Sequence, residues 1–444
     1  MTSSRKVDLH ILGAGPAGLA VGYYAKKNNI QVRLYESSNN VGGNCKTITH
    51  GEFSFDTGAH RFHDKYNEIT SEIKNLLGDD LLHISAPSQI YRKGQLIDFP
   101  LNLKNLLLKL GFSQLMMIAY ENFIKRFRYN HHPKNFKDLS YQIYGKTLSE
   151  LFLINYTKKL WGQDPVTLES TISGDRLKNL DLASIISEIF IKTDNNKHLD
   201  GSFYYPKYGF GSIFNRIRDN IGSENVKLNS PVKELIHDGY KIKEIIYGGN
   251  KVADVEMVIN SLPINILVNI LNPSPPKEII EIVTSLKYRS LRLCICYLDM
   301  PHFSDKASIY FPEKTIPFTR IYEPKNRSKE MAPKEKTCIV IEIPYSNGDK
   351  ISSQTPAQLF EHIRRTLIEN KLIKKDKIID YSFINMDYAY PVLDVNIKKI
   401  LGPVFSYLGR IKNMYHIGRG AEFKYLHTHN IFRNADNFIR KMLQ

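Results

Sequence analysis

The pattern of apolar and polar positions near the N-terminus predicts a strand, a helix and a second strand. Residues 7–12 form a short, largely apolar run that is typical of a buried strand, and 32–35 form another. Between them, 19–27 combines helix formers with small residues, which predicts a helix packed closely on the strands. This order is typical of a parallel α/β unit.

A glycine-rich turn joins the first strand to the helix, with the sequence Gly13-Ala14-Gly15-Pro16-Ala17-Gly18. Gly13 allows a tight turn, Gly15 lets the backbone approach a pyrophosphate, and Gly18 lets the helix pack against the strand. Glu36 lies 18 residues beyond Gly18, close to the distance at which an acid holds a ribose hydroxyl. This context predicts a dinucleotide site. The alternative is a turn that only closes a helix onto a strand.

Beyond this unit the pattern changes several times. Residues 89–99 predict a hairpin that turns at Lys93-Gly94, 101–200 have a helical pattern interrupted near Gly111, and 204–211 predict a glycine-aromatic loop. Residues 286–345 are rich in predicted strands, and there Cys294 and Cys296 share one face. Further strands are expected at 226–228, 231–236, 257–262, 378–387 and 415–417, and helices at 66–77, 356–373 and 431–442.

Length and charge narrow the class of protein. The 444 residues suit two or three domains, and 42% hydrophobic residues with 26 tyrosines can build a large core. A net charge of +16 favours anionic partners, and a phosphorylated small molecule is preferred because no arginine-rich tail or aromatic-basic repeat indicates nucleic acid. The four cysteines have neither metal-binding nor disulfide spacing. Without a signal peptide or an apolar run of about 20 residues, the cytoplasm is expected.

Additional glycines indicate a ligand larger than NAD. Gly42 and Gly43 follow Glu36, and Gly58-Ala59-His60 comes shortly afterwards. This run resembles the FAD-binding start of the amine oxidase, protoporphyrinogen oxidase and UDP-galactopyranose mutase superfamily, which implies FAD as the cofactor. The resemblance implies that FAD contacts Gly13, Gly15, Pro16, Ala17, Gly18, Glu36, Gly42, Gly43, Asn44, Gly58, Ala59, His60, Val232, Gly418 and Arg419.

Short motifs in the same order along nearly the whole chain resemble UDP-galactopyranose mutases, especially the eukaryotic type. The motifs are Gly58-Ala59-His60, Tyr91-Arg92-x-Gly94-Gln95, Lys159-Leu160-Trp161, Gly174-Asp175-Arg176, Tyr310-Phe311-Pro312-Glu313, Pro317-Phe318-x-Arg320, Tyr390-Pro391, and Gly418-Arg419 with Phe423-Lys424-Tyr425. The implied fold is α/β: an FAD-binding Rossmann-like, doubly wound domain, a mixed β-sheet substrate domain and a helical insertion. The divisions expected are FAD-binding parts at 1–85, 201–265 and 405–444, a hairpin at 86–100, the insertion at 101–200 and the substrate sheet at 266–404.

The resemblance also implies roles for individual residues. Arg176 and Arg320 match two arginines that grip a substrate diphosphate, and Tyr390 and Tyr425 match tyrosines that reach it. Guanidinium groups suit this role because they bind phosphate through paired hydrogen bonds and stay charged. His60 matches a histidine beside the flavin. The same resemblance places Arg419 near the flavin and the substrate channel, and it makes Arg92 and Tyr310 contacts for NADPH or NADH as reductant.

The implied activity is interconversion of the pyranose and furanose forms of a nucleotide sugar by reduced FAD, with no Ser-His-Asp triad and no metal. Asn102 and Thr157 replace mutase residues near the nucleotide, and His427-Thr428-His429 replaces an Asn-x-Asp pattern, so the sugar and base stay open. A second hypothesis is a flavin oxidase or dehydrogenase acting on an amine or ring carbon. A third is a non-catalytic flavoprotein that contacts a membrane surface through the basic stretch around Lys125 to Lys134.

Overall fold

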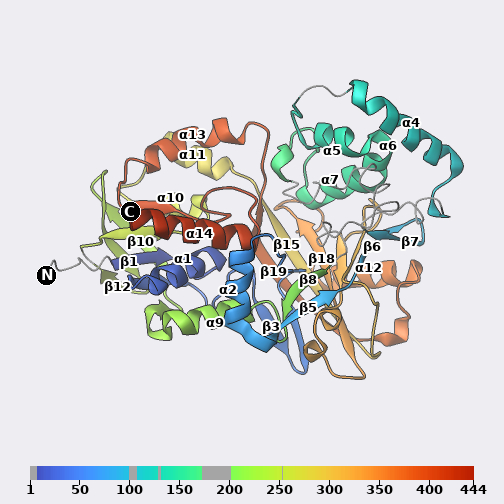
Figure 1. Ribbon diagram of the computed structural model, residues 1–444, viewed down its shortest axis with the longest axis horizontal. Helices are drawn as coiled ribbons and strands as arrows, with labels where there is room; N and C mark the ends of the chain where they lie inside the picture. The colour runs from blue at the N-terminus through green and yellow to red at the C-terminus, as the bar shows by residue number, and fades with distance from the viewer. Residues whose placement is uncertain (1–7, 100–107, 129–131, 173–201, 253) are drawn as a thin grey trace.

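A five-stranded parallel sheet forms the centre of one half of the molecule, on the left in Figure 1. The computed structural model describes residues 8–99, 108–128, 132–172, 202–252 and 254–444. The strand order is β20-β13-β1-β2-β9, and every pair is parallel. The bounds are β1 Asp8–Leu12, β2 Gln31–Tyr35, β9 Val226–Lys227, β13 Met257–Asn260 and β20 Met414–His416. Segments from the start, middle and end of the chain therefore meet in this sheet.

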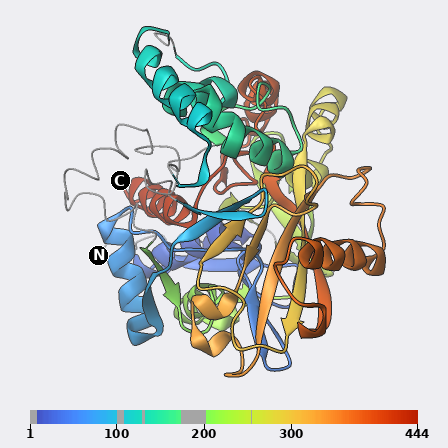
Figure 2. The ribbon, with the colours of Figure 1, turned by 90° about the vertical axis from the view of Figure 1, so that its right-hand side faces the viewer.

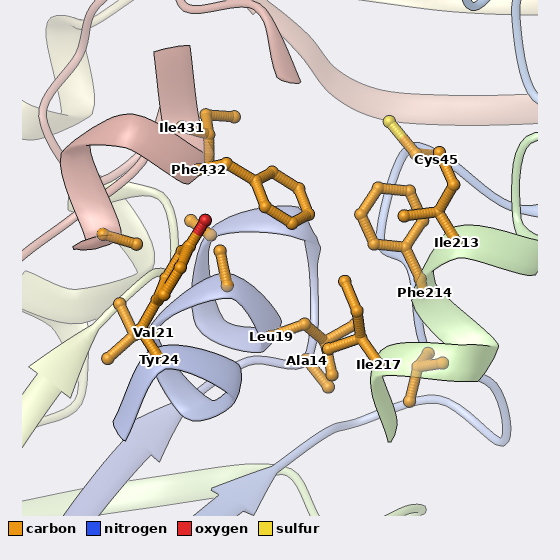
Figure 3. Packing of buried hydrophobic residues seen from close by; sticks show 14 of the residues in the cluster. Ala14, Leu19, Val21, Tyr24, Cys45, Ile213, Phe214, Ile217, Ile431 and Phe432 are labelled. Carbon is orange, nitrogen blue, oxygen red and sulfur yellow. The ribbon is translucent and has the colours of Figure 1, made fainter. Parts of the chain in front are cut away.

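Three helices pack together against this sheet: α1 (Pro16–Lys27), α9 (Ser212–Ile221) and α14 (Thr428–Met442). Figure 3 shows Leu19 of α1, Ile217 of α9 and Phe432 of α14 within one buried cluster. Gly22 allows the close approach, because a Cβ there would lie 2.9 Å from the Ile221 side chain. Helix α14 begins three residues before the predicted start at Ile431, since the His427 and Asn430 side chains cap it.

A seven-stranded mixed sheet forms the other half, in the order β19-β15-β18-β17-β16-β6-β7. Its strands are β6 Ser88–Arg92, β7 Gln95–Phe99, β15 Tyr288–Leu298, β16 Ser308–Tyr310, β17 Arg320–Tyr322, β18 Thr337–Tyr345 and β19 Ile378–Pro391. The predicted hairpin at Lys93-Gly94 is confirmed, with both residues at positive φ. Cys294 and Cys296 share a face as predicted, with their Sγ atoms 3.9 Å apart.

The predicted loop at 204–211 is wrong over its first residues. Strand β8 (Ser202–Pro206) pairs there with β5 (Leu81–Ser85). Phe203 and Tyr205 are buried while Tyr204 is half-buried, so the strand alternates within a run of aromatic residues. The remaining strands are the hairpin β3 Thr47–His50 with β4 Phe53–Asp56, and a sheet of β10 Val232–His237, β11 Ile242–Tyr247, β12 Asn250–Val252 and β14 Leu271–Asn272.

A group of helices lies over one end of the mixed sheet, at the upper right of Figure 1 and at the top of Figure 2. It contains α4 Phe112–Arg128, α5 Phe136–Tyr144, α6 Lys146–Leu148 and α7 Asn155–Trp161, with a π-helical stretch at Ser149–Ile154 between α6 and α7. The predicted break near Gly111 is confirmed, whereas 101–107, 129–131 and 173–200 of the predicted insertion lie outside the described residues. The other helices are α2 Asn67–Leu77, α10 Ile264–Asn269, α11 Lys277–Ser285, α12 Pro356–Glu369 and α13 Ile397–Leu408.

These elements confirm the predicted α/β class with a parallel nucleotide-binding type of sheet, a mixed sheet and a helical insertion. The exact domain boundaries stay predictions. Helix α4 exposes the apolar side chains of Phe112, Met116 and Tyr120. Contact of this region with a membrane surface also stays a prediction. Among the described helices, none combines the length and apolar character that crossing a bilayer requires.

Candidate functional site

Two glycine segments meet at the start of helix α1. Gly13 has φ +90°, and a Cβ on Gly18 would lie 2.0 Å from the Gly13 carbonyl oxygen. A Cβ on Gly43 would lie 3.1 Å from the Gly15 Cα, and the Gly42 N–H donates to the Ala14 carbonyl at 2.8 Å. Gly15 is the N-cap of α1 and offers no side-chain acceptor, so the first N–H groups of the helix are available to an anion.

Glu36 closes this turn from the side. The end of β2 places its carboxylate where it accepts hydrogen bonds from the Ala14 N–H at 2.9 Å and from the Ser38 N–H at 2.9 Å. The Ser230 N–H donates to the Glu36 carbonyl at 2.7 Å, which brings the segment before Val232 to the same place. We call this arrangement the glycine cradle: it combines glycines, which have no side chain, with a helix N-terminus and a carboxylate. It fits a dinucleotide.

Gly418 reaches the same turn from the far end of the chain. It has φ +117°, and a Cβ there would lie 2.6 Å from the Ala17 Cβ. The close approach requires glycine, and it places Arg419 next to the cradle. Two predicted cofactor contacts that are about 400 residues apart in the sequence are thus neighbours in space.

His60 lies beside the second glycine segment. Its Nε2 is 3.0 Å from the Asn44 carbonyl oxygen, its Nδ1 is 3.9 Å from the Cys45 Sγ, and its ring stacks on Phe210 at 5.1 Å. Burial lowers the pKa of His60 to about 4, so the imidazole is neutral at neutral pH. Its Nε2 contact with a carbonyl is a hydrogen bond when Nε2 carries the proton.

Asp56 supports the loop that carries Gly58 and His60. Its buried carboxylate accepts hydrogen bonds from the Tyr205 hydroxyl at 2.5 Å, the Thr47 hydroxyl at 2.7 Å and the Phe210 N–H at 2.9 Å. Its carbonyl accepts from the Tyr322 hydroxyl at 2.6 Å. Strand β4 is therefore tied to both halves of the molecule directly before the histidine loop.

Arg320 begins β17 and pairs with a buried acid of the neighbouring strand β18. Its Nε and Nη2 donate to Glu342 at 2.8 and 2.6 Å, and the two side chains are 12% and 1% exposed. Burial opposes the charge, but the Glu342 carboxylate outweighs it and raises the pKa of Arg320 above its ordinary value. Within the part of the chain that the structure describes, Nη1 has no hydrogen-bond partner and is the nitrogen left for a ligand.

Glu342 also connects Arg320 to the histidine loop. Its Oε1 accepts a hydrogen bond from the Ala59 N–H at 2.9 Å while it binds Arg320. The sequence interpretation missed this residue. The available signal is a single acid within the apolar strand 337–345, in which every residue is buried, because a buried carboxylate requires a partner.

Tyr390 and Tyr425 come together around the single tryptophan. Their ring centroids are 6.1 Å apart and lie 5.7 and 5.5 Å from that of Trp161 at the end of α7. Burial, with the nearby Glu342 carboxylate, raises the pKa of Tyr390 to about 12, so its hydroxyl keeps its proton. Arg320, its acid partner and both tyrosines are thus brought to one region, whereas Arg176 lies outside the described residues.

Arg419 is held by backbone rather than by an acid. Its Nη1 donates to the Ala389 carbonyl at 3.3 Å, and its Nε and Nη2 donate to the Leu426 carbonyl at 3.1 and 2.6 Å. The guanidinium carbon lies 5.7 Å from the Tyr390 ring and 5.0 Å from the Tyr425 ring. These contacts join the two tyrosine segments.

The lysine of the Lys-Leu-Trp motif fixes α7 to the mixed sheet. The Lys159 Nζ donates to the Phe311 carbonyl at 2.6 Å and to the Glu313 carbonyl at 2.8 Å, and burial lowers its pKa to about 7. Tyr310, on the same segment, lies 5.9 Å from the Arg320 guanidinium carbon. Arg92 ends the adjacent parallel strand β6, and Tyr310 ends β16, so these two residues lie at the same end of neighbouring strands. Their contact with a reductant stays a prediction.

The departures from the mutase pattern have different outcomes. Asn102 lies outside the described residues, and Thr157 is buried in α7. The His427 and His429 rings stack at 5.5 Å at the start of α14, where His427 forms the helix cap together with Asn430. In the described ranges, no cluster of three or more His, Cys, Asp or Glu side chains could hold a metal ion.

Residues 16–373 match the family model of flavin-containing amine oxidoreductases, and the chain belongs to this family. Among curated relatives, it is 25% identical over 240 residues to a dTDP-fucopyranose mutase of Escherichia coli, a match that covers 51% of the chain and 59% of the relative. It is 23% identical over 252 residues to the mitochondrial protoporphyrinogen oxidase of Nicotiana tabacum, covering 51% of the chain and 50% of the relative. The matched region thus spans only about half of the length of these relatives.

Solved structures confirm the fold. The crystal structure of a reduced UDP-galactopyranose mutase has a TM-score of 0.84 at 20% identity and covers 99% of this chain and 94% of its own. A putative protoporphyrinogen oxidase from Exiguobacterium sp. 255-15 has a TM-score of 0.77 at 14% identity, with 99% of both chains covered. The predicted resemblance to mutases within the amine oxidase superfamily is confirmed.

Proposed function

We propose that the protein binds FAD in the glycine cradle and a nucleoside-diphosphate sugar beside Arg320, and that it interconverts the pyranose and furanose forms of the sugar. The observation that carries this proposal is the dual contact of Glu342 with the Arg320 guanidinium and the Ala59 N–H. One buried carboxylate fixes a phosphate-binding group relative to the flavin-side loop. The similarity to a UDP-galactopyranose mutase and a dTDP-fucopyranose mutase supports the substrate class.

The proposed cofactor contacts divide by the part of FAD they would hold. The N–H groups at the start of α1 would bind the pyrophosphate, and Glu36 would accept from a ribose hydroxyl, releasing its bond to the Ala14 N–H. Bound and reduced, the flavin would supply the nucleophile of the isomerisation. The His60 segment would line the flavin end of the cofactor, where the neutral imidazole of His60 adds no positive charge, and Gly418 would close the cradle against Ala17.

The proposed substrate contacts stabilise a leaving diphosphate. Nη1 of Arg320 and the Tyr390 and Tyr425 hydroxyls would donate to the phosphate oxygens, with Arg176 as the predicted second cation. The charge of Arg320 is already fixed by Glu342, so it needs no reorganisation as negative charge develops on the leaving group. The aromatic rings of this region would exclude water from the sugar.

A second function, oxidation of an amine or ring carbon with hydride transfer to flavin, is favoured by the family match and by the similarity to protoporphyrinogen oxidases. Under this alternative, Arg320 would bind a substrate carboxylate. NADPH or NADH as reductant belongs to the first proposal.

Anaerobic turnover distinguishes the two functions. Dithionite-reduced, FAD-loaded protein is incubated with UDP-galactopyranose or dTDP-fucopyranose, and the sugar nucleotides are separated by chromatography. We expect a ring-contracted isomer and an unchanged flavin redox state. In a parallel aerobic assay, oxidised protein free of dithionite should consume no oxygen with the same sugar nucleotide. Flavin reduction by an amine substrate, followed by oxygen consumption and without any isomer, would support the oxidase instead.

A further inference from the structure

Two aromatic residues have a left-handed backbone conformation close to the site. Tyr388 has φ +55° and lies two residues before Tyr390, and Phe423 has φ +50° and lies two residues before Tyr425. The left-handed conformation is unfavourable for residues with a bulky side chain, and it persists only where the surrounding structure enforces it. Among the seven described non-glycine residues with positive φ, these two are the aromatic ones.

The strained residue before Tyr390 belongs to an irregularity in the mixed sheet. Arg289 of β15 pairs with Tyr390, but Leu291 pairs with Met386, so three residues of β19 face the single Ser290 of β15. Such bulges bend a strand and re-aim the side chains beside them. The strain at Tyr388 therefore accompanies a change in the direction of Tyr390.

The ring of Tyr288 contacts both strained residues. Its centroid lies 5.0 Å from that of Tyr388 and 5.2 Å from that of Phe423, with edge-to-face geometry in both contacts. Tyr288 lies at the start of β15, whereas Phe423 lies in the segment before α14. One ring thus holds the two segments that carry the site tyrosines.

Arg419 joins the same two segments through their backbone. It donates to the carbonyl of Ala389, the neighbour of Tyr390, and to the carbonyl of Leu426, the neighbour of Tyr425. All three guanidinium nitrogens are used in these bonds, and the side chain is half-buried. Its geometry is that of a positioning residue between strand β19 and the segment before α14.

We propose that Tyr288 and Arg419 form a brace that sets the spacing of Tyr390 and Tyr425, so that both hydroxyls meet one diphosphate. This inference rests on the proposed function. The strained backbone at Tyr388 and Phe423 is the cost of pre-organising the two tyrosines before the ligand arrives. Tyr288 touches neither ligand nor flavin in this account and acts through the two segments it holds.

The single tryptophan provides a direct readout of the brace. Trp161 contacts both site tyrosines, so its fluorescence and its quenching by acrylamide report their arrangement with or without ligand. The test compares FAD-loaded wild type, Tyr288→Leu, Tyr388→Gly and the control Lys371→Gly. Lys371 has φ +54° directly after the cap of α12, so its substitution relieves similar backbone strain on another element.

We expect Tyr388→Gly to keep or raise the melting temperature while it weakens UDP binding about five- to tenfold, because relieved strain is paired with lost pre-organisation. Tyr288→Leu should weaken UDP binding similarly and increase acrylamide quenching of Trp161 in the ligand-free protein. Lys371→Gly should raise the melting temperature without either effect. If Tyr288→Leu and Tyr388→Gly both bind UDP with wild-type affinity and both show wild-type acrylamide quenching of Trp161, the inference is overturned.

The two proposals fail in different ways. If wild-type protein does not bind UDP, the proposed function fails, and the brace is then judged by ligand-free quenching of Trp161 alone. Increased quenching in Tyr288→Leu and Tyr388→Gly, but not in Lys371→Gly, supports the brace in that case. Unchanged quenching in both contradicts it.

Discussion

The glycine cradle is formed mainly by backbone groups, whereas the arginine region is formed by side chains. The cradle consists of backbone from 13–43, closed by Gly418, and its polar groups are N–H groups and one carboxylate. The arginine region consists of side chains from β17, β18, β19, α7 and the segment before α14, and it contains the buried ion pair of Arg320 and Glu342. The cradle should therefore be sensitive to added atoms, and the arginine region to removed charge.

The largest effect is expected from Gly18→Ala in the cradle. The new Cβ would lie 2.0 Å from the Gly13 carbonyl oxygen, and neither backbone segment can move without opening the turn. We expect a loss of more than about 4 kcal/mol in unfolding free energy and purification without flavin. Chemical denaturation and the flavin absorption spectrum measure both.

Gly402→Ala is the matched control. Gly402 lies within α13, and apart from its chain neighbours and its own helix backbone a Cβ there meets no atom within 4 Å. Gly402 precedes Pro403, so the gain in helix propensity is opposed by the contact of the new Cβ with the proline ring. We expect unfolding free energy to change by less than about 1 kcal/mol and flavin content to stay unchanged. Equal behaviour of the two alanine variants would contradict the assignment of close packing to the turn.

The next effect is expected from Arg320→Ala in the arginine region. It leaves Glu342 buried without its cation, which should cost about 3–5 kcal/mol of unfolding free energy, and it should weaken UDP binding by more than about tenfold. The double variant Arg320→Met with Glu342→Met should recover part of the stability, because it removes both buried charges but leaves the Ala59 N–H without its acceptor, and it should not recover UDP binding. If the double variant binds UDP like wild type, Arg320 is a structural residue.

A smaller effect is expected from His60 at acidic pH. Its folded-state pKa of about 4 lies below its ordinary value of 6.5, so the unfolded state binds more protons between these values. The contribution of His60 to stability is complete above pH 6.5 and is lost as the pH falls towards 4, by about 2–3 kcal/mol. Urea denaturation of flavin-free protein at pH 7 and 4.5 measures this loss. His60→Gln should lose less stability over the same interval, and an equal loss would contradict a buried neutral imidazole.

The contrast between a local backbone site and a site of distant side chains also explains how much the sequence could predict. The cradle was found from Gly13 to Glu36 because its chemistry depends on spacing along one local segment, although its closure by Gly418 came from the family resemblance. The strand at 202–206 was missed because its partner, 81–85, lies more than 100 residues away and its aromatic residues hide the alternation. Local pattern does not report long-range pairing.

The arginine region was accessible through resemblance alone. Nothing local indicates that Arg320, Tyr390 and Tyr425 converge, since they come together through the register of β15 with β18 and β19 and through the turn before α14. Glu342 was missed although a lone acid in an apolar strand is a usable signal. Arg419 was expected beside the flavin, and its bonds to two backbone carbonyls add a structural contribution that no pattern indicates.

The central claim is that two guanidinium groups share one diphosphate, and a double-mutant cycle for UDP binding tests it most directly. Wild type, Arg176→Ala, Arg320→Ala and the double variant are titrated with UDP in the dithionite-reduced, FAD-loaded protein by calorimetry. We expect each single change to weaken UDP binding strongly and the coupling free energy to exceed about 1 kcal/mol. Additive effects, or affinity within about twofold of wild type in both single variants, would contradict it.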